Sequence, residues 1–318
     1  MIELYSTRKS DNIRIKGYEN VTNDDCPSFS GIVAGECKGD VWVDNTDNPH
    51  IAIAYSYAVG SYAFLGSISN ETESSKLKDF IYNSLFSYLK EKGFNCFEYS
   101  IENDDLKPYI QKMFEEKFIQ SEKEYSFRYR ENYNSSEYPS PDNKNFGYSI
   151  LGVNNIQNLL TDKYIIHNSL PDNYIIQNSL PENYIMQRID NDFWSKVLNG
   201  DYTNESFLTE RLLESWGNIE NFCEKSVGFC ITYLDRIAAV ILGTARFKNI
   251  VPIDIETKDE FKKMGLGYSL TIEFVKECLK KGLIAQWDCV ESNPVSYKLA
   301  EKAGFQLFKE NVVYWFEI

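Results

Sequence analysis

A loop carrying two glycines, set between an apolar strand and an amphipathic helix, constrains the fold of this chain most strongly. Residues 253–257 alternate apolar with acidic side chains, the period of a half-buried strand. The loop runs from Lys262 to Tyr268, and the apolar stripe from Leu270 to Leu279 predicts the helix that follows. The pattern therefore predicts a strand, a tight loop and a helix in direct succession.

Such a loop favours an anionic ligand. Gly265 and Gly267 let the backbone approach a ligand closely, and the first N–H groups of a helix have no partner within the helix. The helix dipole also favours negative charge at this end. An ordinary strand-to-helix turn is the alternative interpretation, because two spaced glycines alone are a weak motif.

The chain beyond this helix continues the alternation of strands and helices. A second strand is expected at 283–290 and a last strand at 311–316. Between them a helix begins after Asn293, a good N-cap, with Pro294 at its first position, and Gly304 ends it. The order from 250 onward is thus strand, helix, strand, helix, strand.

These residues resemble a known family. The run Lys262–Gly267 is similar to the Arg/Gln-x-x-Gly-x-Gly/Ala loop of the GNAT superfamily of acyl-CoA-dependent N-acyltransferases, and 293–305 resembles its next helix signature. The strand at 255–257 and the Trp287–Asp288 pair resemble the branch typified by zwittermicin A resistance acetyltransferases. The resemblance covers about 181–318. It departs from the family at Lys262, which lacks a planar fork for phosphate, and at Ala300, where many members carry a tyrosine.

The resemblance implies acetyl-CoA as cosubstrate, with no metal. Its diphosphate would bind the loop and helix start, and its pantetheine arm would pair with the strand backbone. The expected cofactor-binding residues are Ile255, Thr257, Lys262, Lys263, Met264, Gly265, Leu266, Gly267, Tyr268 and Asn293.

Acyl transfer to an amine needs a base, because only a neutral amine attacks a thioester. Glu256 is the first candidate and Asp254 the second, since both leave the strand on one face; a solvated strand face is the alternative. Tyr297, one turn before Ala300, is the candidate that protonates the leaving thiolate, with Ser296 and water as alternatives. Plain helix packing is the competing interpretation for Tyr297.

The first third of the chain repeats the same order of elements. Strands at 39–44, 51–57 and 62–66, a helix at 77–89, a strand at 96–100, a helix at 109–117 and a strand at 125–129 are expected. The turn at 66–73 lacks a second glycine and a lysine and carries two carboxylates, so it should reject a diphosphate. We expect a mixed α/β fold of two GNAT-like domains, each a central, mostly antiparallel sheet flanked by helices, with the N-terminal one degenerate. An unrelated mixed domain is the alternative.

The expected domains are 1–135, a linker at 136–180 and an acyl-CoA-binding domain at 181–318. The polar run 132–145 has the composition of a loop. A ten-residue repeat starts at Tyr164, Tyr174 and Tyr184, a period too short for a helical solenoid. Its third copy is expected to form the first strand of the C-terminal domain.

Composition excludes several classes of function. With 33 basic and 47 acidic residues the net charge is −14, which disfavours nucleic acid and anionic membranes as partners. Seven scattered cysteines without C-x-x-C spacing suit reduced thiols, and two histidines give little support to a metal centre or a histidine triad. The amino terminus has no apolar signal region and no long apolar run follows, so a cytoplasmic protein is expected.

The leading functional hypothesis is an N-acetyltransferase that moves an acetyl group from acetyl-CoA to a primary amine of a small molecule, such as an antibiotic or metabolite, by direct attack. A non-catalytic acyl-CoA sensor or pseudoenzyme is one alternative. An interaction protein that docks a partner through the repeat is another. The sequence leaves the acceptor and the oligomeric state open.

Overall fold

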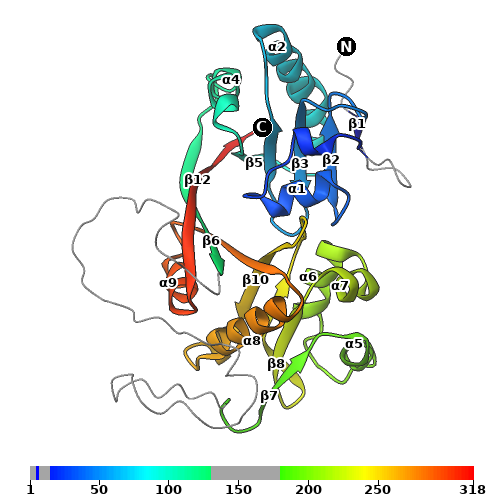
Figure 1. Cartoon of the computed structure of the whole chain (residues 1–318), viewed down its shortest axis with the longest axis vertical. Helices are drawn as coiled ribbons and strands as arrows, with labels where there is room; N and C mark the ends of the chain where they lie inside the picture. Colours follow the sequence, from blue (N-terminus) through cyan, green and yellow to red (C-terminus); the bar gives the residue numbers. More distant parts are fainter. Residues whose placement is uncertain (1–4, 7–14, 130–179) are drawn as a thin grey trace, which may run out of the picture. The chain divides into compact units, whose positions relative to one another are not determined.

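A computed structural model describes residues 5–6, 15–129 and 180–318 of the chain (Figure 1). A two-residue strand, β1 (Tyr5–Ser6), pairs antiparallel with Trp42 and Val43 of the N-terminal half. The N-terminal half contains α1 (Pro27–Val33), β2 (Gly39–Val43), β3 (Ile51–Ser56), β4 (Tyr62–Gly66), α2 (Glu71–Phe80), a π-helical turn (Ile81–Leu85), α3 (Phe86–Glu91), β5 (Cys96–Ile101), α4 (Lys107–Met113) and β6 (Gln120–Tyr129).

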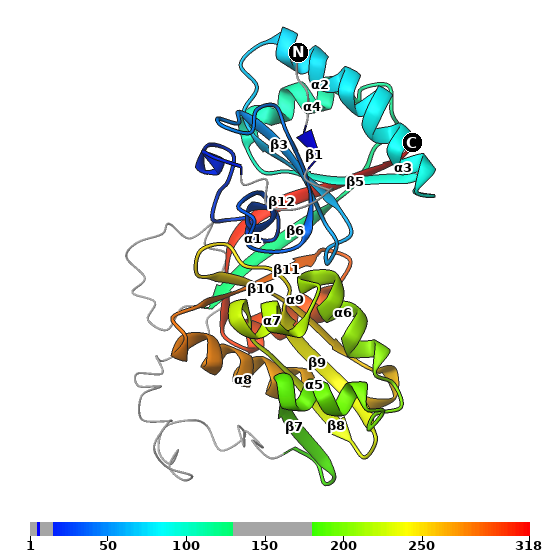
Figure 2. The same cartoon turned by 90° about the vertical axis from the view of Figure 1, so that its right-hand side faces the viewer.

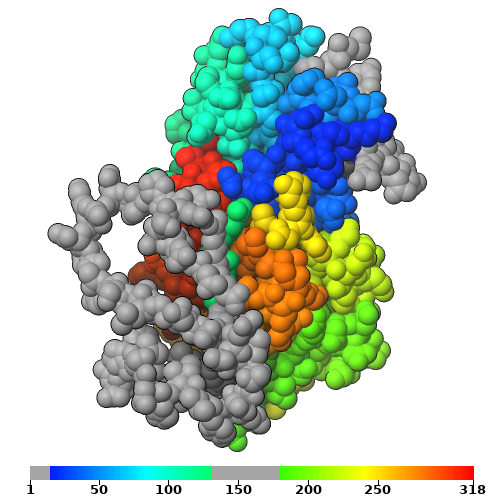
Figure 3. Space-filling model, viewed as in Figure 1, coloured from blue at the N-terminus to red at the C-terminus, as the bar shows by residue number. Residues whose placement is uncertain are grey.

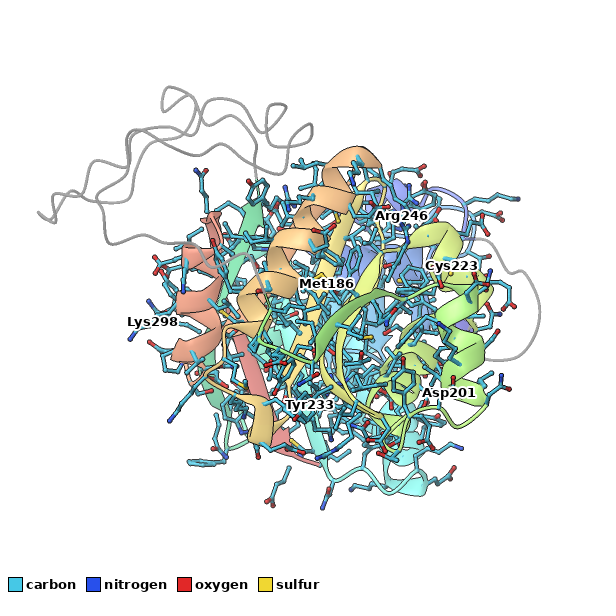
Figure 4. The ribbon with its side chains drawn as sticks, turned by 90° about the horizontal axis from the view of Figure 1, so that it is seen from below. Met186, Asp201, Cys223, Tyr233, Arg246 and Lys298 are labelled. Atoms are coloured by element: carbon cyan, nitrogen blue, oxygen red, sulfur yellow. The ribbon has the colours of Figure 1, made fainter. Side chains whose placement is uncertain are left out.

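The C-terminal half contains β7 (Tyr184–Arg188), α5 (Asn191–Leu198), α6 (Ser206–Trp216), α7 (Ile219–Lys225), β8 (Gly228–Tyr233), β9 (Arg236–Gly243), β10 (Ile250–Thr257), α8 (Leu266–Lys280), β11 (Ile284–Val290), α9 (Pro294–Lys302) and β12 (Phe305–Glu317). The predicted strand, helix, strand, helix, strand order is therefore present in both halves. The third repeat copy forms β7, as predicted, at one edge of the sheet, where Figure 4 labels Met186. The earlier copies, up to residue 179, and the polar run 132–145 lie outside the described residues.

Local sequence signals explain the ends of the helices that shape the site. Asn293 Oδ1 accepts a hydrogen bond from Ser296 N–H at 3.1 Å, and Pro294 occupies the first helical position of α9. Gly282 (φ 66°) follows α8 and Gly304 (φ 89°) follows α9, both in the left-handed conformation that glycine adopts without strain. These residues place β11 and β12 directly after their helices.

The two halves share one twelve-stranded sheet, in the order β1-β2-β3-β4-β5-β12-β6-β11-β10-β9-β8-β7. The mixed α/β fold is confirmed, but the sheets expected for the two halves are joined into one. Each half gives its last strand to the other: β12 pairs with β5 from the N-terminal half, and β6 pairs with β11 from the C-terminal half. The exchanged strands also pair with each other, antiparallel, from Phe305 opposite Tyr129 to Trp315 opposite Gln120. Figures 1 and 2 show β12, in red, running from the C-terminal half along β5.

The hydrophobic cores follow the exchange. Phe127 on β6 is fully buried among side chains of the C-terminal half, including Phe274 on α8. Phe316 on β12 is buried in the N-terminal core, where its ring lies 5.7 Å from that of Phe97 and 5.0 Å from that of Phe114. Burial of a phenylalanine contributes roughly 1.5–3 kcal/mol, so each half stabilises the core of the other. Figure 3 shows the C-terminal strand, in red, among blue and green residues of the N-terminal half.

The described helices do not include one that combines the length and the apolar character needed to cross a bilayer. Within the same ranges, no group of three or more His, Cys, Asp or Glu residues is arranged to hold a metal ion.

Candidate functional site

The glycine loop folds as a tight turn that opens α8. Gly265 is the N-cap, in the left-handed conformation (φ 78°), and Lys263 also has a positive φ of 65°. At the start of α8, Ser269 N–H donates a hydrogen bond to Gly265 C=O at 3.1 Å. The N–H groups of Leu266, Gly267 and Tyr268 precede it and have no acceptor within the helix. The loop therefore presents donors at the positive end of a fifteen-residue helix.

Gly267 lies where the helix approaches its neighbours closely. A Cβ at this position would be 3.4 Å from Leu299 on α9, 3.7 Å from Ile255 and 3.8 Å from Thr257, both on β10. A larger side chain at residue 267 would fill the space between these three elements. At Gly265, by contrast, a Cβ would meet nothing within 4 Å, so the space outside the turn is open. The residues present fit a diphosphate held against the helix start.

Side chains around the loop add positive charge and close contacts. Lys262 Nζ lies 2.5 Å from Asp259 Oδ1, which holds this lysine beside the turn. Lys302 on α9 lies over the ring of Tyr268, with Nζ 4.8 Å from the ring centroid. Tyr184 Oη donates to Met264 Sδ at 3.3 Å. Figure 4 shows α9 beside this region, with Lys298 pointing outward from it.

Strands β10 and β11 separate beside this loop. They pair in parallel only from Ile250 to Pro252, whereas β10 pairs with β9 from Ile253 to Thr257. Pro252 C=O accepts a hydrogen bond from Thr244 N–H, just after β9, and Lys258 N–H donates one to Ala238 C=O on β9. The polar groups of residues 252 and 258 thus point toward β9. Because a strand residue directs its two polar groups to one side and its neighbours direct theirs to the other, Ile255 and Thr257 direct theirs into the opening. This is the edge on which the sequence predicts an added pantetheine strand.

A cavity of about 340 Å³ continues from this opening toward the N-terminal half. Ile255, which also borders Gly267, lines it. Its wall includes Asp25 and Cys26 before α1, Ser28 and Phe29 on α1, the loop at Ala58 and Val59, and Asn293 before α9. Its charged lining residues are Asp25, Glu102, Glu124, Asp254, Asp288 and Lys309.

Both exchanged strands contribute residues to the cavity lining. Asp288 on β11 is opposite Ser126 on β6, and Lys309 on β12 is opposite the same serine. Lys309 Nζ lies 2.9 Å from Glu102 Oε2, and the Glu102 side chain is only 3% exposed. Asn311 Nδ2 donates to the other Glu102 oxygen at 3.0 Å. Both halves of the chain are needed to build this wall.

Two cavity carboxyls have raised pKa values. Burial, and then the charge of Asp288, raise the pKa of Glu124 to about 8. Burial raises the pKa of Asp288 to about 6, opposed by hydrogen bonds from Ser126 and Gln286 that favour its charged form. Gln286 Nε2 lies 3.1 and 3.2 Å from the two Asp288 oxygens. Carboxyls with raised pKa values often cluster at functional sites.

The family model described as GNAT acetyltransferase matches residues 21–314, nearly the whole chain. The chain belongs to the GNAT acetyltransferase family. "Uncharacterized N-acetyltransferase YdfB" of Bacillus subtilis (strain 168) is 27% identical over 129 residues, which are 41% of this chain and 47% of YdfB. The chain thus spans about half the length of this curated relative.

Solved structures agree with the fold. A GCN5-related N-acetyltransferase-like protein from Streptococcus suis 89/1591 has 18% sequence identity and a TM-score of 0.52, with 88% of each chain covered. A tandem GNAT protein from the clavulanic acid biosynthesis pathway has 9% identity and a TM-score of 0.50, covering 96% of this chain and 92% of its own. At these identities the likeness shows the fold. GNAT family members generally use acetyl-CoA.

In this GNAT protein, Arg211 holds both carboxylates that the sequence proposes as base. This α6 side chain is ion-paired with Asp254 and with Glu256 on β10. Asp254 lines the cavity, whereas Glu256 is absent from its lining. A guanidinium in contact occupies the oxygen lone pairs with which a base would accept a proton. Their catalytic role stays a prediction.

Residues on α9 divide between the cavity and helix packing. Asn293 and Ser296 line the cavity, and Ser296 Oγ accepts a hydrogen bond from Trp287 Nε1 at 2.8 Å. The Tyr297 ring packs edge-on against the rings of Tyr125 and Phe127, at 5.0 and 4.9 Å between centroids, and is absent from the lining. These contacts are those of a packing residue, and the role of Tyr297 as proton donor stays a prediction.

Cys289, which also lines the cavity, is a poor candidate nucleophile. Burial raises the pKa of its thiol to about 11, so little thiolate forms at neutral pH. This favours direct attack over an acyl-cysteine intermediate.

The corresponding turn of the N-terminal half is closed by its own side chains. Asn70 Oδ1 accepts from Glu73 N–H at 3.1 Å, and Glu73 Oε2 accepts from Ser69 N–H at 2.9 Å. This capping box satisfies donors at the start of α2 and places a carboxylate there. An anion at this turn would have to displace Glu73, so the turn is unsuited to a diphosphate.

Sequence reasoning missed Glu124, Glu102 and Lys309 as site residues. Asp288 was visible in the Trp287–Asp288 pair, but without a role. The polar residues Glu124 and Ser126 alternate with Tyr125 and Phe127, which marks a polar face on a strand. That signal does not say which strand β6 pairs with, and the pairing creates the site.

Proposed function

We propose that this protein is an N-acetyltransferase that moves an acetyl group from acetyl-CoA to a primary amine of a small molecule. The main support for this proposal is the position of Ile255, which borders both the glycine turn and the cavity. A ligand whose diphosphate rests on α8 reaches the cavity along the free edge of β10. The charge of the cavity lining suits an amine, which is cationic in water.

In this proposal the loop residues predicted from the sequence hold the diphosphate. The N–H groups from Lys263 to Tyr268 donate to it, and Lys262 and Lys263 add charge. The backbone of Ile255 and Thr257 orients the pantetheine arm, and Asn293, at the cavity wall, donates to its end. Acetyl-CoA supplies an activated acetyl thioester.

The chain's own residues then manage protons and position. The acceptor must lose a proton before its nitrogen can attack, so a cavity carboxylate is required. Two residues are candidates to protonate the sulfur: Ser296, which lines the cavity, and Tyr297, the candidate from the sequence. A backbone N–H of β10 stabilises the oxyanion of the transition state.

The cavity limits the acceptor to a small molecule. At about 340 Å³ it lies at the lower end of the range for small-molecule sites. The resemblance to the zwittermicin A resistance branch supports an antibiotic or a related metabolite with an amino group as the acceptor.

A non-catalytic acyl-CoA sensor is the second candidate. It is favoured by Ala300, which is fully buried at the position where many GNAT members carry a tyrosine. Such a protein would bind CoA at the same loop but release no product.

The test is release of free CoA thiol from acetyl-CoA in the presence of a panel of small primary amines, with the matching alcohols as controls. We expect release with at least one amine and none with its alcohol. Binding of CoA by calorimetry without release from any amine would favour the sensor. Failure of CoA to bind would overturn both.

A further inference from the structure

Glu124 lines the cavity and lies on β6, the strand that the N-terminal half gives to the other half. It is opposite Val290 on β11 and Asn311 on β12. Asp288 is two residues from Val290, so the two carboxyls are diagonal neighbours on one face, with Cα atoms about 7–8 Å apart. That spacing lets their side chains influence one another.

The two carboxyls differ in their partners. Gln286 and Ser126 hydrogen-bond to Asp288 and fix its orientation. Glu124, by contrast, is only partly buried and faces the cavity. No fully buried side-chain oxygen of the described residues lacks a hydrogen-bond partner, so the Glu124 carboxyl stays within reach of a ligand or water in the cavity.

The remaining charges around Glu124 are matched to each other. Glu102 pairs with Lys309 and Asp254 with Arg211, and Asp25 Oδ1 lies 3.7 Å from Arg128. The negative charge of Glu98 on β5 also raises the pKa of Glu124. The unmatched negative charge of the cavity thus belongs to Glu124 and Asp288, which is enough for one ammonium group.

We infer that Glu124 is the group that takes the proton from the ammonium of the acceptor, and that Asp288 positions and tunes it. This inference rests on the proposed function. It differs from the expectation that Glu256 or Asp254 on β10 is the base. It also makes the N-terminal half, which has no diphosphate turn of its own, the source of a catalytic residue.

The proton balance of this step is complete. The acceptor arrives as an ammonium ion, and one N–H proton passes to the Glu124 carboxylate. The neutral nitrogen then bonds to the acetyl carbon as the carbon–sulfur bond breaks, and a second N–H proton ends on the sulfur. Glu124 returns its proton to water as product leaves. A base with a pKa of about 8 is well matched to an amine near neutral pH.

The inference separates acceptors by charge. An acceptor whose only charge is one ammonium group suits the acidic pair of Glu124 and Asp288, whereas an amino acid would bring its carboxylate into an acidic cavity. We expect 2-aminoethanol and similar monoamines to be acetylated in preference to glycine or β-alanine. The reverse preference would contradict the assignment.

The experiment compares full-length Glu124→Gln, Glu124→Asp, Asp288→Asn, Asp254→Asn and Glu256→Gln proteins with wild type, using the best amine of the panel. Glu122→Gln is the matched control, since Glu122 points to the same face of β6 but does not line the cavity. We expect Glu124→Gln to lower kcat about 100-fold or more with the KM for acetyl-CoA unchanged, and Glu124→Asp to recover part of the loss. The Asp254, Glu256 and Glu122 variants should retain greater activity than Glu124→Gln.

The pH profile distinguishes the roles of the two carboxyls. Wild-type kcat/KM should rise up to about pH 8, as Glu124 ionises. Asp288→Asn removes the neighbouring charge, so the same rise should move to lower pH. A readout independent of turnover is the infrared band of the protonated carboxyl, which should persist above pH 7 in wild type and be lost in Glu124→Gln.

The outcomes separate the two proposals. Activity of Glu124→Gln within threefold of wild type would overturn this inference and leave the N-acetyltransferase proposal standing. Absence of CoA release from every amine would overturn the proposed function and this inference with it.

Discussion

Ionisation of Glu124 should destabilise the folded protein as the pH rises. Its pKa is about 8 in the folded chain and about 4.3 in an unfolded one. The folded state therefore binds more protons between these values, and stability falls as pH rises from about 4 to 8. Glutamine does not ionise, so Glu124→Gln should stabilise the protein at pH 8.5, by on the order of 1–3 kcal/mol, and little at pH 4.5.

Urea denaturation at the two pH values measures this effect, with Glu122→Gln as control. A stabilisation of Glu124→Gln that is equal at both pH values would mean that the carboxyl ionises normally in the folded protein.

Ser296 and Tyr297 make different predictions for the proton that ends on the sulfur. Ser296 lines the cavity, whereas the Tyr297 ring packs on β6. We expect Ser296→Ala to lower kcat about tenfold and Tyr297→Phe, which keeps the packing, to change it less than threefold. Steady-state rates with the best amine decide. A larger loss in Tyr297→Phe would favour the donor proposed from the sequence.

At the residue scale, the cofactor loop was accessible to sequence reasoning because its chemistry is local. Gly265 and the helix that it opens are contiguous in the chain, and backbone groups carry the proposed binding. The cavity carboxyls were not accessible in the same way. Glu124 and Asp288 are neighbours only because β6 pairs with β11, more than 150 residues away.

At the scale of elements, the ion pair between Lys309 and Glu102 ties β12 to the end of β5. Because the Glu102 side chain is 3% exposed, loss of Lys309 leaves a buried charge whose remaining hydrogen-bond donors are neutral. We expect Lys309→Met to lower the free energy of unfolding by about 2–4 kcal/mol. Chemical denaturation measures the change.

The Lys123–Glu310 pair is the matched control, since it joins β12 to β6 and both of its side chains are about half exposed. Lys123→Met should cost less than about 1 kcal/mol. Equal losses in the two variants would show that burial does not determine the value of these pairs.

The order of elements was predictable where their partners were not. Alternation and capping residues predicted most strands and helices in both halves, because these signals are local. The strand at 125–129 proved to begin at Gln120, and the one at 311–316 at Phe305. Their exchange was missed, since a half-buried strand has the same pattern whichever neighbour it pairs with.

At the scale of the whole molecule, the exchange should make the two halves unfold together. The described residues, 5–6, 15–129 and 180–318, belong to one compact unit. Although the sequence suggests two domains, we expect one calorimetric transition. Two separated transitions would show that the exchanged strands do not couple the halves.

Paired core variants test the same coupling. Phe127→Ala removes a side chain of the N-terminal half from the C-terminal core, and Phe316→Ala does the reverse. Each should destabilise the protein by about 3–5 kcal/mol and shift the whole transition. Loss of signal from one half alone would contradict the prediction.

The central claim is that the start of α8 holds the diphosphate of CoA, and titration of CoA into variants of Gly265 tests it most directly. Because this residue is left-handed and has open space around it, Gly265→Asn keeps the turn with a neutral side chain, whereas Gly265→Glu adds a carboxylate. We predict that the Asn protein binds CoA within about fivefold of wild type and that the Glu protein binds it at least about 100-fold more weakly, a difference near 2.7 kcal/mol. Equal CoA affinity in the Glu and Asn proteins would contradict the account.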